Sequence, residues 1–368
     1  MLVDGGTIAW VGRERDAPPC EQRVDLGGRL VSPGLIDAHA HPLYAEPRLA
    51  EAAAVSRGTP YADLVAAGDG MAATVRLTRA ADRGTLTEVV AGRLRAWLDA
   101  GTTTVEAKTG YFFDRDLELQ GLDLLAELTA RPDLPDLGIT FFAAHGPAVG
   151  ADRVTDEYAA YVATWCKEAA GRGAHAVDAF CDDRLFGVDH ARTVLLAARA
   201  AGLRTKVHAD QFHNIGGARL AAEVGAVSAD ELNSVDEAGA RALAAAGVTA
   251  VLCPVTALSI GIPVPVPLLR AAGVTLALGT DHNPGRCGLT DMTVVIGLAI
   301  ASMGLSVDEA LVAATQGGAR SLGRDDVGVV AVGQRADLVA WDADHEGVFA
   351  WGWGVRPHAV WMDGNRIS

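Results

Sequence analysis

The sequence is poor in cysteine and lacks the marks of an exported protein. Its 368 residues include 5 cysteines, and no two of them form a Cys-x-x-Cys pair. Few, scattered cysteines in an odd number are typical of a reduced protein, so we expect a cytoplasmic location. The chain does not open with a basic segment followed by an apolar run, which a secretion signal would need.

Three further absences narrow the class of function. No apolar run approaches the roughly 20 residues that cross a bilayer, so we expect no membrane partner. The net charge is −15 and no basic patch stands out, which argues against a nucleic-acid partner. No Gly-x-Gly-x-x-Gly follows the first strand, which disfavours a nucleotide-binding open sheet. With a membrane and a nucleic acid disfavoured as partners, we expect a small-molecule substrate.

The most informative stretch runs from Pro33 to His41, with the sequence PGLIDAHAH. It predicts a short apolar strand that ends in two histidines separated by one residue. Residues i and i+2 of a strand point to the same face, so His39 and His41 project together. Two imidazoles on one face make half of a metal site, although a bare His-x-His is more often a loop feature without a role.

Apolar strands and helices alternate through the middle of the chain. Repeated βα units favour a closed (β/α)8 TIM barrel, with an open doubly wound sheet as the alternative. The strands are expected near residues 102–106, 137–145, 176–180, 204–208, 248–253 and 274–281, and helices near 85–100, 115–130, 155–172 and 189–201.

Both ends of the chain predict short strands joined by Gly-rich turns. We therefore expect a small β-sandwich domain formed by both termini, residues 1–31 plus 325–368, beside a barrel of residues 32–324. Two unrelated edge hairpins are the alternative.

Ionisable residues recur where the predicted strands end, which in a barrel is the active-site face. They include Lys108, Tyr111 and His145 as well as the histidine pair. His39, His41, His208 and Asp281 together make three nitrogen ligands and one oxygen ligand, a set that suits Zn²⁺ or Fe²⁺. Such a metal would lower the pKa of a bound water. Each residue alone has an ordinary structural explanation, but their recurrence on one face favours the metal.

Several segments carry a family resemblance over nearly the whole chain. Besides the PGLIDAHAH stretch they are EAKTGY (106–111), AAH (143–145), FC (180–181), KVHAD (206–210), GAVSAD (225–230) and GTDHNPG (279–285). With these segments the sequence resembles the amidohydrolase superfamily and, within it, the imidazolonepropionases of histidine degradation. The Lys-Thr-Gly-Tyr and Thr-Asp-x-Asn-Pro-Gly segments are more specific than the histidine pair.

The resemblance implies a barrel with one metal, Zn²⁺ or Fe²⁺, held by His39, His41, His208 and Asp281. It implies hydrolysis of a C–N bond at the amide carbon of a five-membered imidazolone ring, giving formimidoylglutamate. It also implies a substrate pocket in which Arg48 is a candidate for the substrate carboxylate. Tyr111 and His145 would orient the ring or stabilise an oxyanion. The pocket residues are Arg48, Tyr61, Tyr111, His145 and Asn283.

Two positions depart from the pattern that the resemblance implies. Gln211 stands where a glutamate proton shuttle is expected, and Glu231 stands where a histidine is expected. Gln211 cannot carry a proton at neutral pH, so Glu231 is the hypothetical replacement. Alternatively, Glu231 binds a different ring, hydantoin-like or thio-substituted, or coordinates the metal. Gln211, Glu231 and Asp281 are the predicted catalytic residues. His213 and His282 are nearby proton donors, but His282 is expected to face away.

Two other functions stay open at this stage. A ring deaminase would use a similar barrel, although the replacements at Gln211 and Glu231 count against a standard one. A metal-binding or ligand-binding paralogue with little catalysis is the alternative outside enzymes, and Gln211 is its best support. A homodimer is possible, but the sequence identifies no interface.

Overall fold

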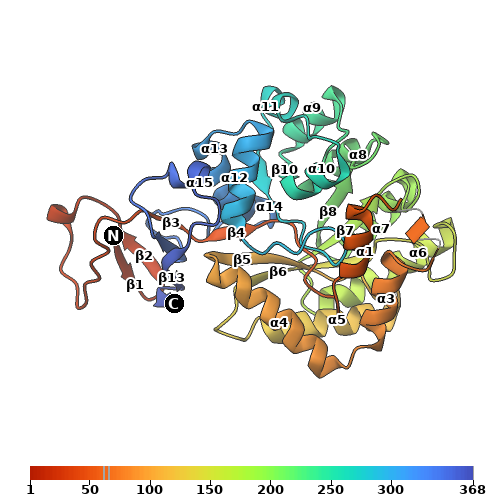
Figure 1. The fold of residues 1–368 in the computed structure, drawn as a ribbon, viewed down its shortest axis with the longest axis horizontal. Helices are drawn as coiled ribbons and strands as arrows, with labels where there is room; N and C mark the ends of the chain where they lie inside the picture. The colour runs from red at the N-terminus through yellow and green to blue at the C-terminus, as the bar shows by residue number, and fades with distance from the viewer. Residues whose placement is uncertain (61–62, 65–66, 368) are drawn as a thin grey trace.

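Eight parallel strands form the centre of the computed structural model, which describes residues 1–60, 63–64 and 67–367 (Figure 1). They follow one another around the sheet in the order of the chain. Their bounds are β4 (Leu35–Asp37), β5 (Thr102–Lys108), β6 (Asp136–Ala144), β7 (Ala176–Cys181), β8 (Arg204–Ala209), β9 (Ser228–Glu231), β10 (Thr249–Leu252) and β11 (Leu276–Leu278).

The sheet closes into a barrel between its first and last strands. The Ala38 N–H donates to the Leu278 carbonyl at 3.1 Å, and the Asp281 N–H donates to the His39 carbonyl at 2.9 Å. The His41 N–H continues this seam by donating to the His282 carbonyl at 2.8 Å. The seam therefore places the residues after β4 beside the residues after β11.

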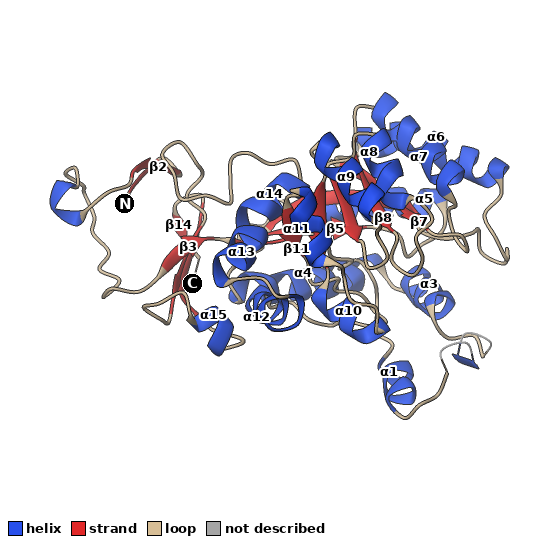
Figure 2. Cartoon of the chain, turned by 90° about the horizontal axis from the view of Figure 1, so that it is seen from above, coloured by secondary structure: helices blue, strands red, loops and turns tan. Residues whose placement is uncertain are grey.

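Helices surround the strands, as the view from above shows (Figure 2). Several begin at a side chain that accepts a hydrogen bond from the first turn, as Asp82, Asp114, Thr155 and Asp236 do. The helices are η1 (Glu14–Asp16), α1 (Leu49–Ser56), α3 (Met71–Ala80), α4 (Arg83–Asp99), α5 (Arg115–Leu128), α6 (Asp156–Gly171), α7 (Val188–Ala200), α8 (Gly217–Glu223), α9 (Glu237–Ala246), α10 (Pro254–Ile260), α11 (Val266–Ala272), α12 (Met292–Met303), α13 (Val307–Val312), the π-helical turn η2 (Ala313–Gly317), α14 (Gly318–Ser321) and α15 (Val348–Trp351).

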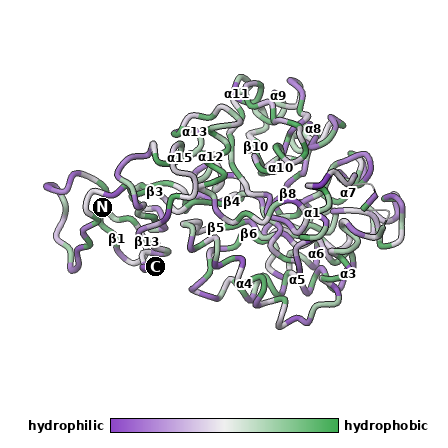
Figure 3. Tube along the Cα trace, viewed as in Figure 1, coloured by the Kyte–Doolittle hydropathy of each residue, from purple (hydrophilic) through white to green (hydrophobic). Residues whose placement is uncertain are grey.

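A small antiparallel sheet lies beside the barrel, where both termini meet (Figure 1). Its order is β14 (Asn365–Arg366), β13 (Pro357–Met362), β12 (Leu338–Trp341) and β3 (Val31–Pro33). The hairpin of β1 (Leu2–Asp4) and β2 (Thr7–Trp10) is a separate sheet, and its Ile8 N–H donates to the carbonyl of Gln334, in the segment before β12, at 2.8 Å. The segment after β2, rich in charged residues, is largely purple in Figure 3.

The structure confirms the predicted fold class, a TIM-type barrel with a small sheet that both ends of the chain supply. One strand, β9, was not among the predicted ones. The division at residues 31/32 and 324/325 stays a prediction, and β3 crosses the first of these boundaries. Within the described residues no helix combines the length and the apolar character needed to cross a membrane.

Candidate metal centre

Three predicted ligands converge at the carboxyl ends of β4 and β11. The Nε2 atoms of His39 and His41 lie 3.3 Å apart. Asp281 Oδ1 lies 3.6 Å from His39 Nε2 and 3.5 Å from His41 Nε2. All three side chains are buried. The barrel seam thus brings together residues that are separated by more than half of the chain.

His208, from the end of β8, completes the cluster. Single ligand atoms of His39, His41 and His208 all lie within 4.8 Å of one another. The same limit holds for ligand atoms of His39, Glu231 and Asp281. Buried imidazoles and carboxylates this close together, from four strand ends, fit a divalent cation.

Other side chains hold the outer atoms of these ligands. Asp230 Oδ2 lies 2.7 Å from Nδ1 of His39, and Asp178 Oδ2 lies 2.9 Å from Nδ1 of His208. The Thr256 hydroxyl donates to Asp281 Oδ2, which leaves Oδ1 facing the histidines. Partners of this kind fix the orientation of metal ligands and keep their inner atoms available.

Burial and charge set the protonation preferences at the cluster. Burial, together with the nearby Lys108, His208 and His41, holds the pKa of His39 well below its usual 6.5. Burial likewise lowers the pKa of His41, although Asp281 opposes the shift. A neutral imidazole is the form that binds a metal, so both shifts favour coordination.

Glu231 lies beside this cluster and is almost completely buried. It follows the buried Asp230 on β9, and its left-handed φ of 76° breaks the usual alternation of strand side chains. Its Oε2 has no hydrogen-bond partner among the described residues. Burial and the charges of Asp281 and Asp230 raise the pKa of Glu231 well above its usual value, while a hydrogen bond from Gln211 opposes this. The two departures from the family pattern therefore contact each other.

Aromatic rings form one wall of the cluster. Phe142 stacks on His145 with ring centroids 4.3 Å apart and on His208 at 4.5 Å. The Tyr111 ring lies 5.2 Å from that of His145 and 6.0 Å from that of His41. His145 Nδ1 lies 2.7 Å from the Gly110 carbonyl, so its ring is fixed. Tyr111 and His145, both predicted pocket residues, thus border the ligands.

The remaining predicted residues have varied positions. Arg48 bonds Glu51 at 3.0 Å and Thr74 at 2.6 Å, and its Nη2 lies against Gly285, where a Cβ would come within 1.9 Å. The Asn283 amide bonds within its own turn, to the Asp281 carbonyl and to the backbone N–H groups of Gly285 and Arg286. Tyr61 lies outside the described residues.

His213 and His282, the two histidines that the sequence offered as nearby proton donors, do not face the ligand cluster. His213 is exposed. His282 is buried with its ring between Tyr44, whose hydroxyl lies 3.0 Å from Nε2, and Trp97. Burial lowers the pKa of His282 to about 4.

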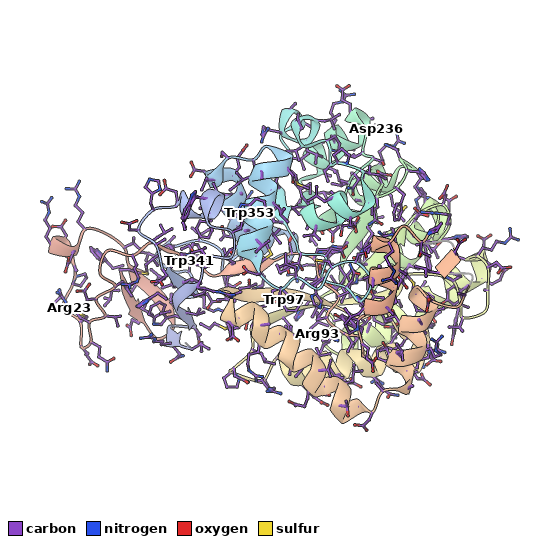
Figure 4. All side chains as sticks on the ribbon, in the orientation of Figure 1. Arg23, Arg93, Trp97, Asp236, Trp341 and Trp353 are labelled. Carbon is purple, nitrogen blue, oxygen red and sulfur yellow. The ribbon has the colours of Figure 1, made fainter. Side chains whose placement is uncertain are left out.

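Buried hydrogen bonds stabilise the barrel seam and the loop that follows His41. Asp37 accepts hydrogen bonds from Trp97 Nε1 at 2.8 Å and from the Thr280 hydroxyl at 2.6 Å. Arg93 donates to the carbonyls of Pro42, Tyr44 and Ala45, in the loop that follows His41. Both Trp97 and Arg93 come from α4 (Figure 4). One helix therefore anchors the loop and the seam that carry three of the ligands.

Sequence reasoning missed the residues that support the ligands. They are Glu106, Asp178, Lys206, Asp230 and Thr256. Strand periodicity could have indicated two of them, because Lys206 and Glu106 lie two residues before His208 and Lys108 and therefore share their faces. Asp178 and Asp230 gave a weaker signal, a single acidic residue within a short strand.

Comparisons with known proteins agree with this architecture. The model of the Amidohydrolase family matches residues 30–367. This chain belongs to the amidohydrolase family. Within the family it is 39% identical to an imidazolonepropionase of Deinococcus deserti, over 100% of this chain and 91% of that protein. It is 40% identical to an imidazolonepropionase of Mycolicibacterium smegmatis, over 93% of this chain and 84% of that protein.

Solved structures of the same fold are more distant in sequence. A 5-methylcytosine deaminase from Klebsiella pneumoniae superposes with a TM-score of 0.78 at 19% identity, covering 100% of this chain and 94% of that one. An adenosine deaminase from Xanthomonas campestris with bound zinc gives a TM-score of 0.65 at 22% identity, covering 91% of this chain and 80% of that one. These likenesses support the barrel of this amidohydrolase-family enzyme and do not bear on its substrate.

Proposed function

We propose that this chain hydrolyses a C–N bond in a five-membered cyclic amide, most like the conversion of 4-imidazolone-5-propanoate to N-formimidoyl-L-glutamate. The observation that carries the proposal is the convergence of His39, His41, His208 and Asp281 with the carboxylate of Glu231 beside them. The identity of about 40% with imidazolonepropionases supports the choice of ring.

The four ligands would hold one divalent ion, Zn²⁺ or Fe²⁺. Such an ion supplies a hydroxide nucleophile near neutral pH and polarises a carbonyl. The chain's own residues then have defined tasks. Glu231 takes the proton that the attacking water loses and returns it to the leaving ring nitrogen. Gln211 donates a hydrogen bond to Glu231 and fixes the direction of its carboxylate.

The pocket residues would bind and orient the ring. Tyr111 and His145 border the ligands, and the Tyr111 hydroxyl donates toward the carbonyl oxygen as it gains charge. His145, whose Nδ1–H donates to the Gly110 carbonyl, orients the ring with Nε2 as an acceptor. Arg48 binds the propionate carboxylate at the loop that contains Gly285. Tyr61 and Asn283 complete the proposed pocket. The geometry of the Asn283 amide, which bonds within its own turn, favours a role in shaping the loop.

The test is the ring-opening of imidazolone propionate by protein loaded with Zn²⁺ or Fe²⁺, followed by ultraviolet absorbance. Loss of a general base costs about 10²- to 10⁴-fold in rate, so Glu231→Gln should lower kcat by that amount and still retain one metal per chain. Glu237→Gln is the matched control, because Glu237 is an exposed residue of α9 that pairs with Arg241.

Each result bears on the proposal. No turnover by metal-loaded wild-type protein would reject imidazolone propionate as the substrate. Hydantoin-like and thio-substituted rings would then be tested, and ammonia release from an amidine ring would identify a deaminase. Unchanged kcat in Glu231→Gln would show that the proton travels by another residue.

A further inference from the structure

A layer of charged side chains lies inside the barrel, next to the metal ligands. It consists of Glu106 and Lys108 on β5, Asp178 on β7, Lys206 on β8 and Asp230 on β9. All five are at most 1% exposed. TIM barrels usually fill this space with branched apolar side chains, so a wholly charged layer calls for a physical reason.

The layer touches the metal ligands through two carboxylates. Asp230 Oδ2 lies 2.7 Å from His39 Nδ1, and Asp178 Oδ2 lies 2.9 Å from His208 Nδ1. The first contact has hydrogen-bond geometry, whereas the second is close but not aligned as a hydrogen bond. Asp178 also accepts a hydrogen bond from the His208 backbone N–H at 3.2 Å, so each histidine has a buried acidic neighbour.

Lys108 is the residue that these two carboxylates share. Its Nζ lies 2.6 Å from Asp178 Oδ2, 3.6 Å from Asp230 Oδ2 and 2.9 Å from Glu106 Oε1. Lys206 contacts Glu106 at 3.0 Å, Asp230 at 3.4 Å and the Ala38 carbonyl at 3.0 Å, but forms no ion pair with Asp178. Of the two lysines in the layer, Lys108 is thus the one that bridges the partners of His39 and His208.

The chemistry of this layer favours ammonium groups over a second metal. His39, Glu106 and Asp230 have ligand atoms within 4.8 Å of one another, which is a spacing that a cation could use. The ammonium groups of Lys108 and Lys206 already lie among these carboxylates. They balance two of the three negative charges of the layer.

We propose that Lys108 is a positioning residue that fixes two metal ligands at once. By contacting both Asp178 Oδ2 and Asp230 Oδ2, it holds these carboxylate oxygens close to Nδ1 of His208 and His39, where each favours the tautomer with its proton on Nδ1. That tautomer leaves the Nε2 lone pair of each ring for the metal. The inference rests on the proposed metal-dependent function, and it assigns to the Lys-Thr-Gly-Tyr segment a task separate from substrate contact.

The first test is the metal affinity of Lys108→Met, measured by competition with a chromogenic chelator for Zn²⁺ and Co²⁺. Loss of an outer partner typically costs 10- to 100-fold in metal affinity, and we expect that loss together with a changed visible spectrum of bound Co²⁺. Lys206→Met should weaken binding less, because Lys206 reaches only one of the two carboxylates. Equal affinity in Lys108→Met and wild type would overturn the proposal.

A charge-balanced variant separates positioning from folding. Lys108→Met alone leaves the buried carboxylates with one cation fewer and should lower the stability of the fold. The double variant Lys108→Met with Glu106→Gln removes one charge of each sign, so it should regain stability relative to Lys108→Met but not metal affinity. Recovery of wild-type affinity would show that Lys108 acts only through total charge. Asp178→Asn tests the same contact from the other side and should reproduce the altered Co²⁺ spectrum.

Asp136→Asn is the matched control, since Asp136 is a strand aspartate at the opposite end of the barrel that pairs with Arg335 and Arg324. It should leave metal affinity and the Co²⁺ spectrum unchanged. These readouts need no substrate, so they stay informative if imidazolone propionate is not turned over. Failure of wild-type protein to bind one metal would instead reject the proposed function itself.

Discussion

Replacing Thr280 by valine tests whether buried hydrogen bonds at the barrel seam stabilise the fold. The Thr280 hydroxyl donates to Asp37 Oδ2 at 2.6 Å and accepts from the His282 N–H at 3.0 Å. Thr280 and Asp37 are 0% exposed, so water cannot replace either partner. Valine has nearly the same shape but neither donates nor accepts.

The magnitude follows from the two bonds that are lost. A hydrogen bond to a charged group contributes about 1.5–3 kcal/mol, and an unsatisfied buried N–H costs about 1–3 kcal/mol. Allowing for relaxation, we expect Thr280→Val to lower the free energy of unfolding by about 3 kcal/mol. Thr280→Ser keeps the hydroxyl and loses one methyl group, so it should cost about 1 kcal/mol.

The assay is urea unfolding of the metal-free protein at pH 7.5. Where two variants have the same m-value, the difference between their unfolding midpoints gives the difference in their free energies of unfolding. A second readout is metal affinity, which should fall in the valine variant because Asp281 follows Thr280 directly. If Thr280→Val and Thr280→Ser unfold within about 0.5 kcal/mol of each other, well inside the gap expected from the lost bonds, the seam does not depend on this hydroxyl.

Two further predictions concern backbone contact and pH. A Cβ on Gly279 would lie 2.6 Å from His39 Cβ, so Gly279→Ala should displace His39 and weaken metal binding. The control is Gly92→Ala, at an exposed site of α4 where a Cβ would meet nothing within 4 Å. It should leave metal binding unchanged and raise the free energy of unfolding by about 0.5–1 kcal/mol. Burial raises the pKa of the Cys166 thiol from 9.0 to about 12. The stability that the neutral, buried thiol contributes to the folded state is therefore complete below pH 9 and is lost as the pH rises toward 12. Alkaline unfolding curves of Cys166→Ala should therefore show a shallower loss of stability, by up to about 4 kcal/mol; parallel curves would contradict this.

The ligand cluster could be predicted from the sequence because the geometry of a barrel determines which strand ends meet. Parallel strands bring their carboxyl ends to one face, so His39, His208 and Asp281 had to lie near one another once the barrel was inferred. No knowledge of side-chain pairing was needed. Strands such as β6, β10 and β11 were also predictable, since apolar residues dominate them.

The supporting residues could not be predicted in the same way. Lys206 meets Glu106 and Asp230, which belong to other strands, and no local pattern indicates which charges pair across a barrel. Strand β9 was missed for a related reason. It has only the residues Ser228–Glu231 and ends in two acids, and in the interior one of them, Asp230, pairs with Lys108 of β5 and Lys206 of β8.

The backbone at the strand ends explains how consecutive residues serve the same site. Asp210, Glu231 and Asp281 follow or end β8, β9 and β11 with φ values of 50°, 76° and 49°, a left-handed conformation that is uncommon outside glycine. Asp230 can therefore face His39 while the next residue, Glu231, faces Asp281. Asp210 uses the same turn to accept four backbone N–H groups at the start of α8. Strained backbone of this kind persists only where surrounding contacts hold it, and here it lies where the proposed chemistry takes place.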